Sequence, residues 1–368
     1  MVTRRGLLRR AGALAAVGAG AATAGCNGDT TEPTPDQSTP AYAAGLYDPG
    51  EVLDATVHGF TTYNLGAVYE NRDLFPEDAV SQVEAADEGV DAVSLAELDR
   101  FTAQVYADAT PLQLLQGRSV SGAAGGTALL TGSFDPEGIA GTLRGASGER
   151  TTVEESGSAA GHTLYTVEAS GTPAAVALSE GSLGVGATTE ATDTSGEGAL
   201  RTALTTEGGY YGSDGTVEVL VDTLGTGVAT SGLVGNFGAP ASGQVAEGDP
   251  ARPVVTGLRA VGSSVEFGDD GLTSTVAGVY AEGETPSESE LRALVDRVGE
   301  LAAGADGISI PTDEVATAVD GRAATLSVTQ DPEAVFELPA GAPGGVGSLE
   351  LLVLAFFPAA VALLGFAE

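Results

Sequence analysis

Residues 254–282 read VVTGLRAVGSSVEFGDDGLTSTVAGVYAE and contain the clearest strand-pairing signal in the chain. Two runs rich in β-branched residues, 254–267 and 272–282, flank the tetrapeptide Gly268-Asp269-Asp270-Gly271. Glycine and aspartate tolerate the backbone angles of a tight turn, and β-branched residues favour extended backbone. The pattern therefore predicts an antiparallel hairpin.

The same pattern recurs through most of the chain. A second hairpin is predicted where Glu180-Gly181 separates two short apolar runs, 174–179 and 183–188. Further strands are expected at 127–134, 162–168, 228–237, 307–311 and 323–329. Hairpin-connected strands with few helices between them indicate an α+β fold, with antiparallel hairpin-rich sheets and a few covering helices.

Helices are predicted where capping residues precede an apolar spacing of three and four. Asp135 and Pro136 suit the start of a helix whose apolar face includes Ile139 and Leu143. Shorter helical patterns cover 197–205 and 215–224. The strongest helix is expected to be capped by Thr285-Pro286-Ser287-Glu288, with an apolar face made of Leu291, Leu294, Val295, Val298 and Leu301.

Residues 46–110 are expected to be mainly helical, with interruptions. The tetrapeptide Ser94-Leu95-Ala96-Glu97 has the form of a capping box. Apolar residues then recur at helical spacing, at Leu95, Leu98, Phe101, Val105 and Tyr106. This spacing predicts a helix that packs against the core.

The predicted elements divide the body of the chain into two α+β halves, residues 46–226 and 227–338. Each half contains a strand that begins with small residues, ALLTGSF ending at Phe134 and SGLVGNF ending at Phe237. This match is compatible with an old duplication that would make the two halves similar. A Gly/Pro-rich hinge, residues 339–350, follows the second half.

The composition excludes several classes of function. The 368 residues include 51 acidic and 15 basic ones, for a formal charge of −36, and every basic residue is Arg. A chain this acidic repels nucleic acid, so no nucleic-acid partner is expected. The absence of Lys excludes P-loop, protein-kinase and pyridoxal-phosphate chemistry, and a single Cys excludes disulfides and multi-Cys zinc sites.

The combination of abundant carboxylates, no Lys and 54 Gly resembles the composition of proteins from extreme halophiles. In molar salt the Debye length falls to about 3 Å, so closely spaced carboxylates barely repel one another. They stay hydrated and keep the molecule soluble. An acidic protein from a mesophile is the alternative.

The first 26 residues, MVTRRGLLRRAGALAAVGAGAATAGC, have the layout of an export signal. Residues 3–8, which contain Arg4 and Arg5, resemble the twin-arginine (Tat) motif, and the sequence TAGC ending at Cys26 resembles a lipobox. The chain thus resembles a haloarchaeal Tat-exported lipoprotein of an uncharacterised family. That resemblance implies removal of residues 1–25 and lipidation of Cys26. An incidental thiol and a general secretory signal are the alternatives.

Both ends of the mature chain are expected to associate with the membrane. Residues 26–45 comprise the lipidated Cys26 and a Thr/Pro-rich tether that cannot pack a core. Residues 351–367, LLVLAFFPAAVALLGFA, form an uninterrupted apolar segment. As a helix it would cover roughly 25 Å, the short end of what spans a bilayer. A buried or interfacial hairpin is the alternative.

Sequence motifs for catalysis or cofactor binding are absent, so neither a catalytic residue nor a cofactor is expected. His58 stands beside Gly59, and His162 begins a predicted strand. A lone histidine in such a place is more often a hydrogen-bonded structural residue than a catalytic one. Carboxylates are so numerous that the sequence does not single out a catalytic pair.

Two further groups of residues have a structural and a functional interpretation. Asp214 and the pair Asp269-Asp270 lie in Gly-flanked turns and are interpreted as solvated turn residues, with Ca²⁺ binding as the alternative. Tyr210-Tyr211 follow two glycines and are interpreted as core residues, with a sugar-binding surface as the alternative. Whether a metal binds is left open.

These observations predict a non-catalytic cell-surface lipoprotein of a halophile. It would be anchored in the cell membrane through Cys26 and 351–367, with an acidic domain on the extracellular face. The first alternative is a solute-binding lipoprotein of a transporter. A secreted acid/base hydrolase is the second.

Overall fold

The computed structural model describes residues 39–71, 97–110, 122–145, 151–169, 172–189, 192–206, 209–237, 247–249, 251–268, 271–303 and 312–330. Arg4, Arg5 and Cys26, the predicted strand 307–311, the hinge and the segment 351–367 lie outside these residues.

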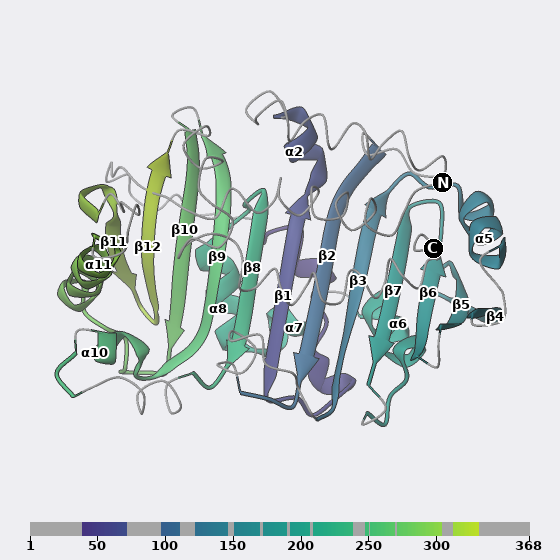
Figure 1. Ribbon diagram of the computed structural model, residues 1–368, viewed down its shortest axis with the longest axis horizontal. Coiled ribbons are helices and arrows are strands. Elements are labelled where there is room, and N and C mark those ends of the chain that lie inside the picture. Colours follow the sequence, from purple (N-terminus) through teal and green to yellow (C-terminus); the bar gives the residue numbers. More distant parts are fainter. Residues whose placement is uncertain are drawn as a thin grey trace.

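Twelve strands within the described residues form one antiparallel sheet (Figure 1). Its order is β11-β12-β10-β9-β8-β1-β2-β3-β7-β6-β5-β4. The strands are β1 Val57–Asn64, β2 Leu98–Ala107, β3 Ala124–Gly132, β4 Thr151–Ala159, β5 His162–Ala169, β6 Thr172–Leu178, β7 Ser182–Thr188, β8 Ala229–Gly235, β9 Leu258–Gly268, β10 Gly271–Tyr280, β11 Ala316–Asp320 and β12 Ala323–Gln330. The α+β fold class with antiparallel hairpins is confirmed.

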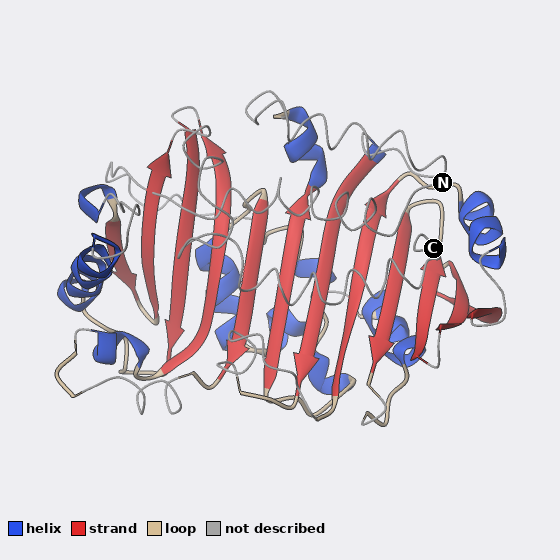
Figure 2. Ribbon diagram, in the orientation of Figure 1, coloured by secondary structure: helices blue, strands red, loops and turns tan. Residues whose placement is uncertain are grey.

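Helices cover both faces of the sheet. Figure 2 shows them in blue behind the sheet, at its two ends and, for the helix that follows β1, at its upper edge. They are α2 Leu65–Glu70, α5 Pro136–Gly145, α6 Gly196–Thr205, α7 Gly209–Ser213, α8 Gly215–Leu224, α10 Ala251–Val255 and α11 Glu288–Ala303, with 3-10 turns η1 Ala43–Gly45, η2 Pro49–Glu51 and η5 Thr312–Glu314.

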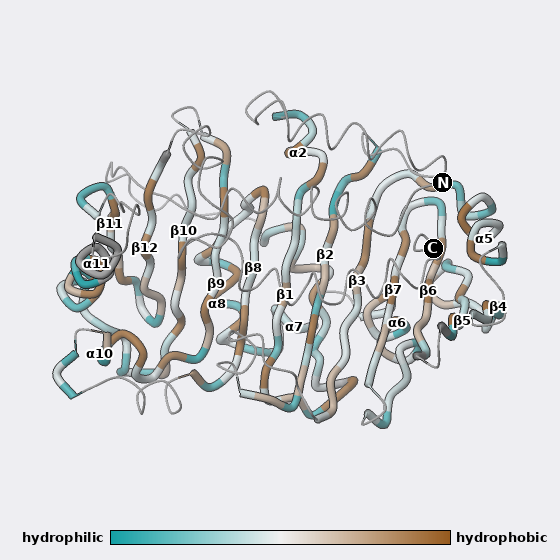
Figure 3. The backbone as a smooth tube through the Cα atoms, in the orientation of Figure 1, coloured by the Kyte–Doolittle hydropathy of each residue, from teal (hydrophilic) through white to brown (hydrophobic). Residues whose placement is uncertain are grey.

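Alternation along the strands separates two cores. On β5 and β6, Val167 and Val176 pack against the cluster that includes Ile139 of α5. Leu164 of β5 and its cross-strand partner Ala177 of β6 pack against Leu200 of α6 on the opposite face. Successive side chains of a strand point to opposite faces, so α5 and α6 cover different sides of the sheet. Figure 3 shows hydrophobic residues interspersed with less hydrophobic ones along the strands.

The two halves of the sheet share one strand order outward from its centre. Each begins with a three-strand meander, β1-β2-β3 or β8-β9-β10. In each half a helix, α5 or α11, then leads to the edge strand, β4 or β11. The chain returns from that edge toward the centre until its last strand pairs with the third strand of the meander, β7 with β3 and β12 with β10. The sequence match does not mark this correspondence, because ALLTGSF lies at the end of β3, a third strand, whereas SGLVGNF lies on β8, a first strand.

Several local predictions are confirmed. Helix α5 begins at Pro136, the Asp135 carboxylate accepts from the Glu137 amide at 3.1 Å, and Ile139 and Leu143 are buried. The Glu180-Gly181 turn joins β6 to β7. The quoted hairpin also forms, with Gly268 opposite Gly271, although Asp269-Asp270 lie outside the described residues. Its first strand starts at Leu258 because residues 254–255 belong to α10.

The helical prediction for 46–110 is wrong in its main part. Among the described residues of this range, β1 and β2 replace the expected helices, and α2 is one short helix between them. Strand β2 pairs with β1 on one side and β3 on the other, and Phe101 through Ala107 are all buried. A central strand covered on both faces shows no alternation of apolar and polar residues, so its apolar spacing imitates that of a helix.

The cap of α11 also differs from the prediction. The Glu290 carboxylate accepts from the backbone amide of Ser287 at 2.7 Å, and the Ser287 hydroxyl accepts from the Glu290 amide at 3.4 Å. The capping box therefore comprises Ser287 and Glu290, which lie two residues later in the sequence than Thr285 and Glu288. The Ser287 amide, together with the Ser287 hydroxyl that donates to the same carboxylate at 2.8 Å, holds the pKa of Glu290 below its ordinary value. Leu291 and Val295 are buried as expected.

Helix α6 lies so close to the sheet that only glycine fits at the contact. A Cβ on Gly196 would lie 2.5 Å from the Gly186 carbonyl oxygen, and a Cβ on Gly186 would overlap the Gly196 carbonyl. Both obstructions are backbone atoms, which cannot rotate away. The two glycines therefore set the distance between α6 and β7.

Gly186→Ala is expected to lower the free energy of unfolding by about 1–3 kcal/mol, the usual cost of overpacking. Gly141→Ala is the matched control, since its Cβ meets nothing within 4 Å on the exposed side of α5. That substitution should raise stability by about 0.5–1 kcal/mol because alanine restricts the unfolded chain. Denaturant titration in molar salt measures both, and equal effects of the two variants would contradict this account.

Candidate functional site

The N-terminal strap, residues 39–56, crosses the central strands on the face that carries α6, α7 and α8 (Figure 1). Tyr42, Ala43, Leu46 and Tyr47 are each less than 5% exposed. Two of these residues, Tyr42 and Ala43, belong to the range 26–45 that the sequence assigned to the tether, because aromatic and aliphatic side chains follow its Thr/Pro-rich part.

Gln104 of β2 fixes the strap to the sheet. Its Oε1 accepts from the Tyr47 amide at 3.1 Å, and its Nε2 donates to the Tyr47 carbonyl at 3.0 Å. The Thr127 hydroxyl of β3 donates to the Tyr47 hydroxyl at 3.2 Å. A side-chain amide thus satisfies both backbone groups of a buried residue, as a neighbouring strand would do.

His58 connects the first strand to the strap and to α7. Its Nε2 lies 3.0 Å from the Ala55 carbonyl, and its Nδ1 lies 2.6 Å from the Tyr210 hydroxyl. A carbonyl can only accept, so Nε2 carries the proton of the neutral ring and Tyr210 donates to Nδ1. The two rings meet edge to face with centroids 5.5 Å apart.

Burial controls the titration of this pair. It lowers the pKa of His58, while the nearby carboxylates of Asp48 and Asp214 act in the opposite direction. Burial also raises the pKa of Tyr210, which is 3% exposed, and the same two carboxylates add to that increase. Both groups are therefore held in their neutral forms at neutral pH.

Asp214 caps α8. Its carboxylate accepts from the amides of Thr216 at 2.7 Å and Val217 at 3.3 Å. In the part of the chain that the structure describes, no three His, Cys, Asp or Glu side chains come together as a metal site would require. The second tyrosine of the predicted pair, Tyr211, donates to Asp222 at 2.7 Å, whereas Tyr210 is buried in the core.

His162 contacts a serine that sequence reasoning did not identify. Its Nδ1 lies 3.0 Å from the Ala160 carbonyl and its Nε2 lies 2.5 Å from the Ser182 hydroxyl. Ala160 has φ of 47°, an uncommon value for a residue with a Cβ. The backbone amide of Ser182 donates to the Ser179 hydroxyl at 3.0 Å. The pair therefore ties the turns of two hairpins, β4–β5 and β6–β7, together.

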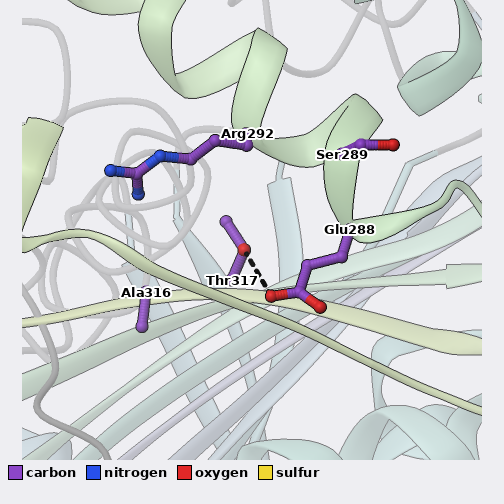
Figure 4. Close-up of a pocket in the computed structure, with 5 residues that line it drawn as sticks. All are labelled: Glu288, Ser289, Arg292, Ala316 and Thr317. Atoms are coloured by element: carbon purple, nitrogen blue, oxygen red, sulfur yellow. Dashed lines mark hydrogen bonds between the residues drawn. The ribbon is translucent and has the colours of Figure 1, made fainter.

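An open pocket of about 490 Å³ lies between α11 and β11. Figure 4 shows its lining residues, Glu288, Ser289, Arg292, Ala316 and Thr317, with the Thr317 hydroxyl directed at the Glu288 carboxylate, 3.4 Å away. Arg292 donates to the Val315 carbonyl at 2.5 Å. The pocket thus combines one carboxylate and one guanidinium with small side chains.

None of the helices in the described ranges combines the length and the apolar character needed to cross a membrane. The segment 351–367, on which the sequence places a second membrane contact, lies outside those ranges.

Comparison with known proteins does not assign a family. No family model and no curated protein matches the chain. Among solved structures, crystal form I of TP0453 aligns with a TM-score of 0.37 and 10% identity, over 82% of this chain and 98% of that chain. Crystal form III of TP0453 aligns with a TM-score of 0.40 and 10% identity, over 82% and 99% of the respective chains.

Replacing Gln104 with Leu is expected to leave the Tyr47 amide and carbonyl buried without partners. The cost should be roughly 1–3 kcal/mol for each group. Thr127→Val, which removes one hydroxyl contact to the same tyrosine, should cost only about 1 kcal/mol. Unfolding titrations of both variants in molar salt measure the difference. A Gln104→Leu variant as stable as Thr127→Val would show that the amide does not hold the strap.

Proposed function

We propose that this chain is a non-catalytic cell-surface lipoprotein. After Tat export directed by Arg4 and Arg5, lipid on Cys26 holds the protein in the cell membrane, and the acidic α+β body faces outward. Such a body serves to bind or to display rather than to catalyse. Its excess of acidic residues suits an environment of molar salt.

The observation that carries this proposal is the strap. It follows the tether directly and is buried at the centre of the sheet, with Tyr47 held by Gln104. Any force between the membrane and the body acts through the residues that follow the lipid anchor. A weakly packed first segment would detach from the body under such a force. Attachment at the middle of a twelve-stranded sheet suits a body that is tethered at this end.

The apolar segment 351–367 is proposed as a second membrane contact. Its seventeen residues contain no charge and lie between Glu350 and Glu368. One acyl-type anchor alone gives marginal, reversible binding, and two signals together give stable attachment.

Membrane fractionation of four forms tests the two anchors. The intact protein is expected to pellet with membranes, Cys26→Ser and a truncation after Gly347 to pellet partially, and the double variant to remain in the supernatant. Cys26→Ala is the matched control for the hydroxyl, and it should behave as Cys26→Ser does. A double variant that still pellets with membranes would contradict the two-anchor arrangement.

The proposal also implies that Ser182 is not a nucleophile, although it meets His162. A serine hydrolase stabilises the developing oxyanion with backbone amides, often that of the serine itself. Here that amide donates to Ser179. Solute binding, the alternative, gains no support from a sheet that is continuous through both halves.

We expect a fluorophosphonate probe to leave the folded protein unlabelled in molar salt. Denatured protein treated in the same way is the control for nonspecific reaction. An adduct on the folded chain that disappears in Ser182→Ala and persists in Ser179→Ala would overturn the non-catalytic assignment.

A further inference from the structure

We propose that the contact between His58 and Tyr210 is a proton-controlled latch. With a neutral imidazole it closes the strap and α7 over the central strands, and proton uptake by His58 opens them. This inference goes beyond the proposed function and does not depend on lipid at Cys26.

The neutral imidazole has a suitable partner at each nitrogen. Nε2–H donates to the Ala55 carbonyl, and Nδ1 accepts from the Tyr210 hydroxyl at 2.6 Å. A second ring proton would occupy Nδ1 and face that hydroxyl. The Tyr210 hydrogen would then have to turn away, although the side chain is 3% exposed and lies in a core cluster. The imidazolium can still donate from Nδ1 to that oxygen, so protonation reverses the bond and takes from the buried Tyr210 hydrogen the acceptor that it has in the closed arrangement.

The surroundings of His58 do not offer a ready substitute. The charged groups that act on it are Asp48 of the strap and Asp214 at the start of α8. Both carboxylates already cap turns, since Asp48 accepts from the Gly50 amide at 2.8 Å and Asp214 from the Thr216 amide at 2.7 Å. On the neighbouring strands the residues opposite His58 are Tyr106 of β2 and Val234 of β8, neither of which carries a charge at neutral pH.

Strap and α7 are linked so that they open together. The Tyr210 amide donates to the Leu46 carbonyl at 3.2 Å, one residue before the Gln104 contact at Tyr47. Helix α7 has five residues, too few to be stable without its packing. Loss of the acceptor for the Tyr210 hydroxyl thus destabilises both segments at one point. Opening would uncover Phe60, on which Tyr42 stacks at 6.2 Å.

The pH dependence has a definite sign. Burial lowers the pKa of His58, so the closed state takes up fewer protons than the open one. Closure is then complete above the ordinary histidine pKa of about 6.5 and is lost as the pH falls below it. The surface carboxylates give the opposite sign, because mild acid reduces their mutual repulsion. In mild acid, lower amide protection in the strap and α7, with equal or higher protection in the rest of the sheet, therefore identifies the latch.

Hydrogen exchange of the full chain in molar salt, between pH 7.5 and pH 5 and corrected for intrinsic rates, tests this proposal. Protection of residues 40–56 and 209–214 should fall by up to about tenfold per pH unit below pH 6.5. The amides of β6 and β7 should keep their protection. His58→Gln should abolish the pH dependence, and His162→Gln, which alters the other histidine, should preserve it.

Tyr210→Phe provides a second variant in case His58→Gln does not fold. It keeps the ring and removes the hydroxyl, so the strap should open more at pH 7.5 and respond less to acid. Strap protection that is independent of pH in the wild type would overturn the latch. So would an unchanged pH response in His58→Gln or, if that variant does not fold, in Tyr210→Phe.

Discussion

The ladder between β1 and β8 is the constraint on which the rest of the structure depends. Each of these strands begins one half of the sheet, and their pairing places Thr61 beside Ser231, whose hydroxyls are hydrogen-bonded. Without this ladder each half would expose the unpaired backbone edge of a largely buried strand. The contact joins residues 170 positions apart, so the centre of the sheet cannot form from local pairing alone. Folding of the two halves is thereby coupled.

An open sheet of this width also needs protection at its outer edges, and arginine provides part of it. Arg201 donates to the Ser158 carbonyl of β4, beside the bulge that Gly157 makes with φ of 137°. At the opposite edge, Arg292 donates to the Val315 carbonyl next to β11. Farther inside the sheet, Arg322 donates to the carbonyl of Tyr280, the last residue of β10, at 2.9 Å. The sole cationic side chain of an acidic protein is thus used on backbone carbonyls, which a planar guanidinium reaches with several donors.

The sequence predicted the elements whose signals are local. A cap and a helical spacing identified α5, and a two-residue turn identified the β6–β7 hairpin. Strand β2 was misread because burial on both faces removes alternation, and the edge strands β4 and β11 were missed because they are short or polar. The site could not be predicted in the same way. His58 and Tyr210 are 152 positions apart, and Gln104 and Tyr47 are 57 apart, so only the strand order brings them together.

A row of buried polar side chains lies at the centre of the sheet, and two of them define the position of the strap. Ser264, Thr230, Thr62 and Thr102 are cross-strand neighbours on β9, β8, β1 and β2, and each is less than 9% exposed. Gln104 and Thr127 continue the polar surface on β2 and β3. Apolar side chains would pack under the strap in several registers with similar energy. Gln104 and Thr127 bond the strap only when Tyr47 lies above them, so any other register would take these partners from two buried polar side chains and cost free energy.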